Sequence, residues 1–107
     1  MIHLVARRIR LDQRDRVAAS LGEVDGPRRA EALESLAAEG VAHETAMLID
    51  TGDGPVIVHA METEDLVESR SVTDQSPRPI DAERRAVMRA ADDGPARAEV
   101  VLDLRPA

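Results

Sequence analysis

The sequence predicts an α+β fold whose elements follow the order β-α-β-β-α-β. The first observation is the stretch 41–61, which has the pattern of two strands joined by the tight turn Thr51-Gly52-Asp53-Gly54. Asp-Gly supplies the positive φ angles that a short hairpin turn requires. The second observation is the symmetry around this hairpin. A strand and then helical periodicity come before it, and helical periodicity and then a strand come after it.

The composition indicates one small domain built without disulfides. A chain of 107 residues is long enough for one core, and it has no cysteine for disulfides or thiolate zinc sites. It has no Phe, Tyr or Trp to stack on bases, and its net charge is −7. Both features argue against binding nucleic acid. A purely aliphatic core is modest, so burial through self-association would help.

No apolar run approaches the roughly 20 residues that cross a bilayer, and the N-terminal residues lack the pattern of a secretory signal. We therefore expect a cytoplasmic protein that does not contact membranes.

The first half of the chain predicts a strand at 2–11 and then a helix in two pieces. Asp12 is a plausible N-cap for the first piece, and Asp25-Gly26-Pro27 interrupts it. The second piece spans 27–39 and ends at Gly40 in a left-handed cap. Its expected buried stripe comprises Ala30, Leu33, Leu36 and Ala37.

Alternation in the hairpin 41–61 places large apolar groups on both of its faces. A layer of helices covers only one face of a sheet, so a second copy of the same sheet is the simplest cover for the other. A two-residue turn makes the numbers of paired positions sum to an odd number. His43 and His59 then lie on opposite faces, and only an additional bulge residue would bring them together. We expect neither a metal site nor a cofactor.

The second half predicts a short helix capped by Thr63, a loop at 71–79, and a helix at 82–91 capped by Asp81. Residues 96–105 alternate as the last strand. This order predicts a ferredoxin-like antiparallel sheet with its helices on one face. The other face would form a homodimer of the dimeric α+β barrel type.

The chain also resembles an uncharacterised domain family of about this length. The residues that match it are Glu39-Gly40-Val41, Glu44, Met47, Ser76-Pro77-Arg78-Pro79-Ile80-Asp81 and Arg84. In that family the last segment is similar to His-Pro-Ile-Asp with a second His three residues on, and Arg78 and Arg84 stand at the two histidine positions here. The family is similar to the dimeric α+β barrels, which include monooxygenases, haem-degrading enzymes and small isomerases. The fold alone transfers none of these activities, and the two arginines weaken an acid–base or metal role.

Histidine is the side chain that titrates near neutral pH unaided, and the chain has His3, His43 and His59. One of them could act as a general acid or base in a cavity, or each could lie at the sheet margin. Glu44 lies among apolar neighbours, where burial would raise its pKa and suit proton transfer. The alternative is an ion pair with an arginine of the first strand or helix.

Three further residues could bind a ligand. Asp81 is either a site residue or a helix cap, and Arg78 and Arg84 flank it. The arginines could bind an anion or remain solvated.

The sequence names no reaction. It supports a cofactor-free dimer that binds or transforms a small molecule, with Glu44, His59, Arg78, Asp81 and Arg84 as candidates. The alternative is a non-catalytic dimeric regulatory or stress-related module. A ligand site needs a cavity of several hundred Å³, and the alternative does not.

Overall fold

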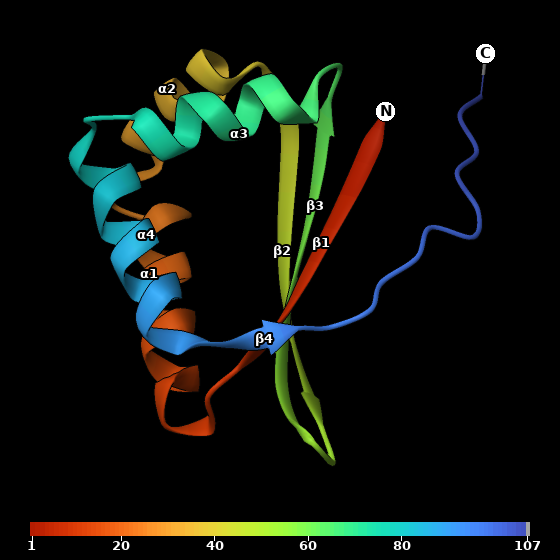
Figure 1. The fold of residues 1–107 in the computed structure, drawn as a ribbon. Helices are drawn as coiled ribbons and strands as arrows, with labels where there is room; N and C mark the ends of the chain where they lie inside the picture. Colours follow the sequence, from red (N-terminus) through yellow and green to blue (C-terminus); the bar gives the residue numbers. More distant parts are fainter. Residues whose placement is uncertain (107) are drawn as a thin grey trace.

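The computed structural model describes residues 1–106 and confirms the α+β class. Within this range, four antiparallel strands form one sheet, and four α-helices lie on the same side of it (Figure 1). No helix in this range is long and apolar enough to cross a membrane. The elements are β1 (Ile2–Ile9), a 3-10 turn (Leu11–Gln13), α1 (Arg14–Val24), α2 (Arg29–Glu39), β2 (Val41–Thr51), β3 (Gly54–Thr63), α3 (Leu66–Gln75), α4 (Pro79–Ala91) and β4 (Asp92–Pro95).

The predicted hairpin is confirmed, and it joins the longest strands of the sheet. Thr51 pairs with Gly54, which leaves a two-residue turn. The Thr51 hydroxyl donates to the Gly54 carbonyl at 2.7 Å and accepts from the Asp53 amide at 3.2 Å. Of the turn residues only Gly54 has a positive φ, 113°, so glycine is required there.

The strand order is β2-β3-β1-β4, and the register assigns each side chain to a face. His59 pairs with Ala46 and lies on the helix-facing side with buried Ile57, whereas His43 pairs with Glu62 on the open side. This confirms that the two histidines lie on opposite faces. The apolar residues of the open face are Ile2, Leu4, Ala6, Met47, Ile49, Val56, Val58 and Ala60.

The core lies between the sheet and the paired helices α1 and α4. Ile9, Val17, Ile57 and Ala91 form a fully enclosed cluster. Leu21, Leu48, Val87 and Met88 pack against it and are partly exposed. Since none of these groups is aromatic, each buries a modest area, and the helix layer leaves grooves beside the core.

The predicted break in the first helical region is confirmed, because α1 ends at Val24 and α2 begins at Arg29. Two details differ. Asp12 lies in the 3-10 turn and does not cap α1. The expected buried stripe of α2 is also wrong: Leu33 is 52% exposed, while Ser35 is buried. The helix is rotated towards α3 and α4 because its polar side chains find hydrogen-bond partners there.

Gly40 ends α2 in the predicted left-handed conformation, with φ of 72°. A Cβ added there meets no atom within 4 Å, so only backbone strain opposes a side chain. We expect Gly40→Ala to lower the free energy of unfolding by about 1 kcal/mol in urea denaturation. Gly22→Ala is the control, because Gly22 lies inside α1 with equally open space. It should stabilise by about 0.5–1 kcal/mol. If both substitutions changed the free energy of unfolding in the same direction, the left-handed conformation of Gly40 would be contradicted.

The predicted loop at 71–79 is wrong, because α3 continues to Gln75. The helix forms despite its polar sequence because both ends are capped. At the N-terminus the Asp65 carboxylate accepts from the Glu68 amide at 3.0 Å, so Asp65 and not Thr63 is the cap. At the C-terminus Arg85 of α4 donates to the backbone carbonyls of Thr73 and Ser76, at 2.6 and 3.0 Å.

The predicted last strand at 96–105 is also wrong. The strand is β4, four residues that directly follow α4. Arg7 on β1 holds Asp92 through two hydrogen bonds, at 2.9 and 2.6 Å, which brings this segment to the edge of β1. After the Ala96 amide donates to the Ala6 carbonyl at 3.0 Å, the chain leaves the sheet. Residues 97–106, which we call the arm, contain no regular secondary structure.

Candidate functional site

Three of the five predicted site residues meet between the sheet and α4. Glu44 lies on β2, His59 lies beside it on β3, and Arg84 reaches them from α4. The Arg84 guanidinium donates to Glu44 Oε1 at 2.9 Å, and His59 Nδ1 lies 3.3 Å from the same oxygen. All three side chains are mostly buried. We call this cluster the triad.

The triad keeps Glu44 ionised. Burial is the largest single influence and raises the pKa of the Glu44 carboxyl, but hydrogen bonds and charges from His59 and Arg84 together outweigh it and lower the pKa to about 2. The expectation of a raised pKa is therefore wrong, because the arginine that pairs with Glu44 lies in α4, a helix distant in sequence. A carboxyl group with this pKa does not act as a general acid near neutral pH.

An ionised carboxylate accepts hydrogen bonds and donates none, so Nδ1 of His59 carries the hydrogen in its contact with Glu44. This contact fixes the orientation of the ring, and Nε2 is the ring nitrogen that does not contact Glu44. A void of about 10 Å³ lies against the ring, lined by His59, Arg84, Val17, Ser20, Leu21, Val87 and Met88. That volume is at the lower limit for one water molecule. The ring is therefore held by Glu44, and the void beside it has room for no more than one water molecule.

A larger groove of about 630 Å³ reaches Glu44 and Arg84 from the side of β2. It lies between β2 and the α1–α2 region, and we call it the β2 groove. Its apolar lining includes Leu21, Val24, Ala32, Leu33, Leu36, Ala42 and Ala46. Asp25 and Arg29 also line it and pair with each other at 2.9 Å. His43 and Thr45 line it as well. The groove therefore has an apolar wall and a polar side, with the Glu44–Arg84 pair as its less exposed polar contact.

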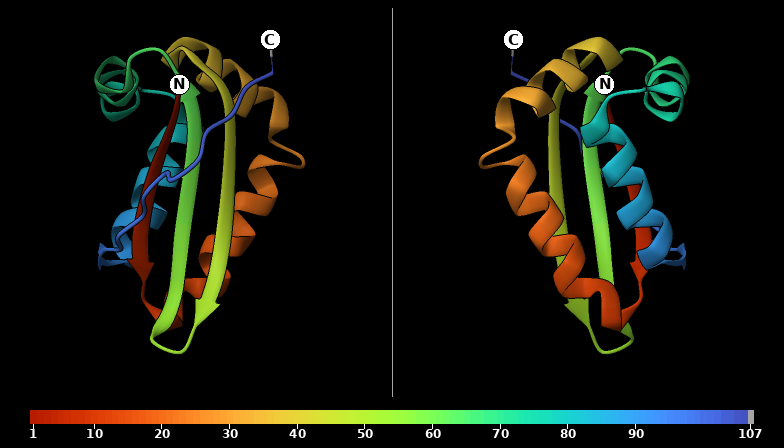
Figure 2. Two further views of the ribbon diagram at one scale, coloured as in Figure 1. Left: turned by 90° about the vertical axis from the view of Figure 1, so that its right-hand side faces the viewer. Right: turned by 90° about the vertical axis from the view of Figure 1, so that its left-hand side faces the viewer.

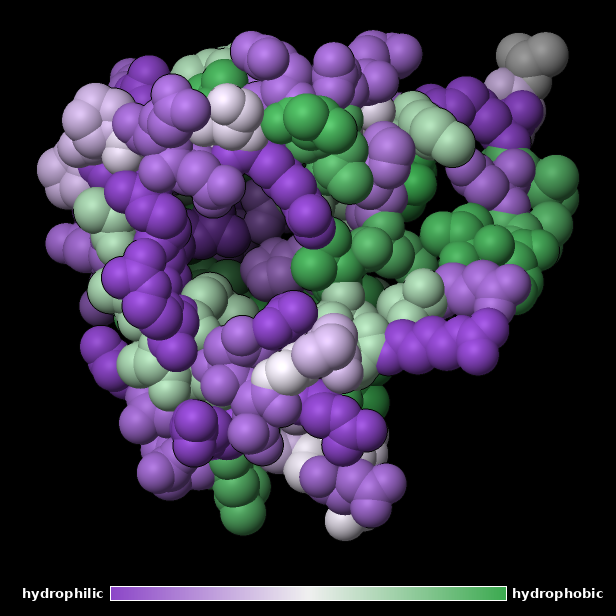
Figure 3. All heavy atoms as spheres, in the orientation of Figure 1, coloured by the Kyte–Doolittle hydropathy of each residue, from purple (hydrophilic) through white to green (hydrophobic). Residues whose placement is uncertain are grey.

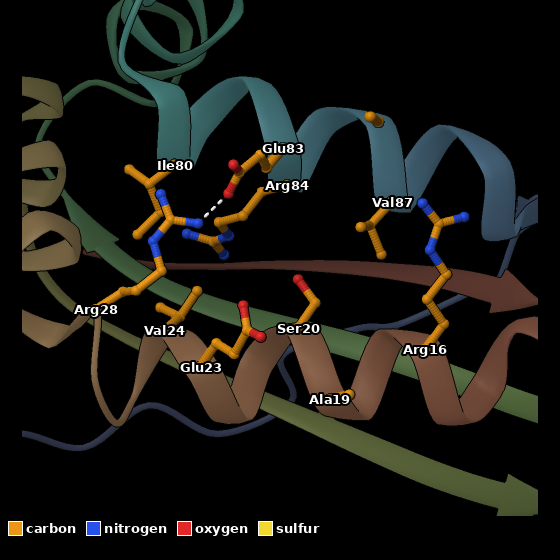
Figure 4. Close-up of a pocket in the computed structure, with 11 residues that line it drawn as sticks. Arg16, Ala19, Ser20, Glu23, Val24, Arg28, Ile80, Glu83, Arg84 and Val87 are labelled. Atoms are coloured by element: carbon orange, nitrogen blue, oxygen red, sulfur yellow. Dashed lines mark hydrogen bonds and ion pairs between the residues drawn. The ribbon is translucent and has the colours of Figure 1, made fainter.

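A second groove of about 470 Å³ runs between α1 and α4. Figure 4 shows Arg84 extending from α4 into this space and Arg16 at the far end of α1. Arg28 bridges to Glu83 across the groove and also pairs with Glu31 at 2.9 Å. Arg16 and Glu23 also line the groove and form no ion pair among the described residues. Arg84 lines this groove, the β2 groove and the small void, so it is the side chain that all three share.

Asp81 belongs to a separate buried cluster and does not cap α4, because Arg78 holds the N-cap position. The Ser35 hydroxyl lies 2.6 Å from one Asp81 oxygen and 2.9 Å from a Glu39 oxygen. The Ser76 hydroxyl donates to the other Asp81 oxygen at 2.5 Å. Asp81 thus lies in a cluster with Ser35, Glu39 and Ser76, and it lines none of the grooves described above.

One serine hydroxyl bridges two carboxyl groups in this cluster. A serine hydroxyl has a single hydrogen, so Ser35 can donate it fully to only one of the two carboxyl oxygens at a time. Burial foremost, with the charges of Asp81 and Glu44, raises the pKa of the Glu39 carboxyl against the lowering effect of hydrogen bonds from Ser35 and Thr73. The cluster joins α2 to α4 through the hydrogen bonds of Ser35.

The other candidates lie apart. Arg78 pairs loosely with Glu34 at 3.6 Å on the surface. His3 lies on the helix-facing side of β1, where its Nε2 is buried without a hydrogen bond among the described residues. His43 is exposed at a register position of the open face, apart from the triad, and it also lines the β2 groove. Within residues 1–106, no group of three or more metal-ligating side chains gathers.

Sequence reasoning missed buried Ser35 and Glu39 and half-buried Ser76 as members of the Asp81 cluster. A signal was present for two of them: Ser35 and Glu39 are four residues apart and share one helix face with Ala32. A small residue followed by two polar ones on one stripe indicates a helix packed against polar partners. Ser76 carried no such signal, because its role depends on where α4 begins.

The chain was compared with known protein families, curated proteins and solved structures. Residues 2–107 match the model of a family of unknown function (DUF6176). No curated protein and no solved structure matches the chain.

Proposed function

We propose a ligand-binding role for this chain, which belongs to DUF6176, a family of unknown function. The ligand is a small and mostly apolar molecule with one compact hydrogen-bond acceptor, and it binds in the β2 groove without a cofactor. The volume of about 630 Å³ falls within the range of small-molecule sites.

The observation that carries this proposal is the apolar stripe of α2. Leu33 and Leu36 line the groove, and Leu33 stays 52% exposed although the helix has the spacing of a core-facing element. Exposed leucines beside a concave apolar surface gain free energy when an apolar molecule covers them, at about 25 cal/mol per Å² of area removed from water. A bound ligand would thus provide the burial that the fold leaves incomplete.

Arg84 supplies the polar contact. A guanidinium has five N–H donors, and its one hydrogen bond among the described residues goes to Glu44. The pair with Glu44 fixes Arg84 against the sheet, so its remaining donors are presented at little further entropic cost. Carboxylate and carbonyl oxygens both match these donors, while a bulky cation does not.

The test is calorimetric titration with octanoate and 2-octanone, two probes that share an apolar chain and differ in charge. We expect at least one to bind, with affinity about tenfold weaker in Arg84→Lys, which keeps the charge and loses the planar fork. Leu33→Glu should abolish binding, because it places a charge on the apolar wall. Arg89→Lys is the matched control on the exposed side of α4. The absence of binding by both probes, or equal affinity in all variants, would overturn the proposal.

We also propose that the fold is ferredoxin-like and forms a homodimer of the α+β barrel type through the open sheet face. Support comes from the element order, the all-antiparallel order β2-β3-β1-β4 and the apolar residues of that face. The second candidate function is a non-catalytic dimeric module, regulatory or stress-related, which the same face favours. A monomer in sedimentation equilibrium at micromolar concentration would count against both dimer proposals. A cytoplasmic location is likewise proposed from the sequence alone.

A further inference from the structure

The arm, residues 97–106, crosses the open face of the sheet. Figure 2 shows it running from β4 diagonally over β1 and β3 towards the end of the sheet where the chain begins. At its far end Arg105 forms an ion pair with Glu62 of β3. The backbone bond from Ala96 to Ala6 anchors its near end. The arm is therefore positioned on the face by a contact at each end.

The arm exposes its apolar side chains. Val101, Leu102 and Leu104 are 86%, 71% and 80% exposed. Figure 3 shows hydrophobic side chains gathered at the right-hand edge of the molecule, where the arm runs. Three neighbouring large apolar groups that stay in water form a contact surface rather than scattered exposure.

The uncovered part of the open face lies next to the arm. Val58 and Ala6, in the middle of the sheet, are buried, whereas Met47 and Ile49 on β2 remain exposed. The open face thus presents two apolar surfaces side by side. One is the arm, which we call the ridge, and the other is the part of β2 near the hairpin turn that carries Met47 and Ile49, which we call the strip. A twofold axis running between ridge and strip would place the ridge of each copy against the strip of the other, and a symmetric dimer requires such self-complementarity.

We infer that the arm is the dimerisation element of this chain, and that its exposed apolar residues bind the open face of a second copy. The inference rests on the proposed homodimer and adds the segment that forms it. It assigns Leu102 and Leu104 to the contact and gives the Arg105–Glu62 pair the role of positioning the arm.

The first test is sedimentation equilibrium of the full chain and of Leu102→Asp/Leu104→Asp. Since both leucines are exposed in the single chain, the substitutions leave the fold intact, as circular dichroism can verify. We expect the full chain to be dimeric at micromolar concentration and the dissociation constant of the variant to rise at least a hundredfold. Val67→Asp, at an equally exposed position on α3, is the control and should not change it.

The second test uses the ion pair. Glu62→Arg should weaken the dimer several-fold by repelling Arg105, and adding Arg105→Glu should restore it. A full chain that is monomeric would overturn the proposed homodimer and this inference together. If the full chain and Leu102→Asp/Leu104→Asp dimerise with the same dissociation constant, the role of the arm is overturned and the proposed homodimer is not. Failure of the reversed pair to restore affinity would overturn the positioning role of Arg105 and Glu62.

Discussion

Replacing Arg84 with methionine is expected to lower the free energy of unfolding by about 3 kcal/mol near neutral pH. Methionine keeps the length of the side chain and removes its charge. Glu44 then remains mostly buried with only His59 as a partner. The pKa of Glu44 falls from 4.5 to about 2 although burial raises it, because the hydrogen bond of His59, followed by the charge and hydrogen bond of Arg84, outweighs burial. Removing Arg84 leaves a buried charge with weaker compensation, and breaking a buried ion pair costs about 3–5 kcal/mol.

The pH dependence of the free energy of unfolding identifies the ionised Glu44 carboxyl as the cause of this loss. A carboxyl whose pKa is lowered by folding stabilises the protein above its unfolded pKa, and this contribution disappears as the pH falls through the folded pKa. The free energy of unfolding of the parent should therefore decrease from about pH 4.5 towards pH 2, and that of Arg84→Met should decrease less. Urea unfolding at a series of pH values measures both. Arg89→Met is the matched control on α4, and an Arg84→Met curve parallel to its curve would contradict the role of the triad.

Two members of the triad could be placed from the sequence, because a hairpin has a simple geometry. The turn at Gly52-Asp53 fixed the register, and the register placed Glu44 and His59 on the same face. The partner Arg84 could not be assigned to Glu44 in the same way. Its position depends on how α4 packs on the sheet, which is decided by tertiary contacts rather than by local pattern. That partner reverses the direction of the pKa shift expected from burial alone.

The errors in the sequence prediction share a physical cause, since each involves a partner far along the chain. The alternation at 96–105 is typical of a strand, yet the edge of β1 is occupied by Asp92, which Arg7 holds there. The polar segment 71–79 is typical of a loop, yet α3 continues through its first part to Gln75, where Arg85 caps the helix. In both cases a guanidinium from a distant element decides the outcome, and propensity is overridden.

The rotation of α2 has the same origin and connects the fold to the proposed site. Hydrogen bonds from Ser35 turn the polar stripe of α2 towards α4. The apolar stripe with Leu33 is then turned towards the β2 groove. The buried cluster and the exposed groove are thus two consequences of one helix orientation, so disrupting the cluster should also affect ligand binding.

Replacing Ser35 with alanine is expected to lower the free energy of unfolding by about 2–3 kcal/mol, because two buried carboxyl groups lose the hydroxyl that links them. Glu39→Gln is the contrasting variant. Its amide keeps the size of the side chain and an oxygen that accepts from Ser35 without a titrating carboxyl, so we expect little loss of stability near pH 4.5. Ser20→Ala, which removes a hydroxyl without a hydrogen bond among the described residues, should change the free energy by less than about 0.5 kcal/mol.

The parent protein and Glu39→Gln should also differ in how their free energy of unfolding changes as the pH rises. A carboxyl whose pKa is raised by folding costs no stability below its unfolded pKa, and stability is lost as the pH rises through the folded pKa. For Glu39 the unfolded value is 4.5, so the free energy of unfolding of the parent should decline above that pH, and Glu39→Gln should lack this decline. Chemical denaturation between about pH 4 and pH 9 compares the curves. A decline of equal slope in Glu39→Gln would contradict the raised pKa of Glu39.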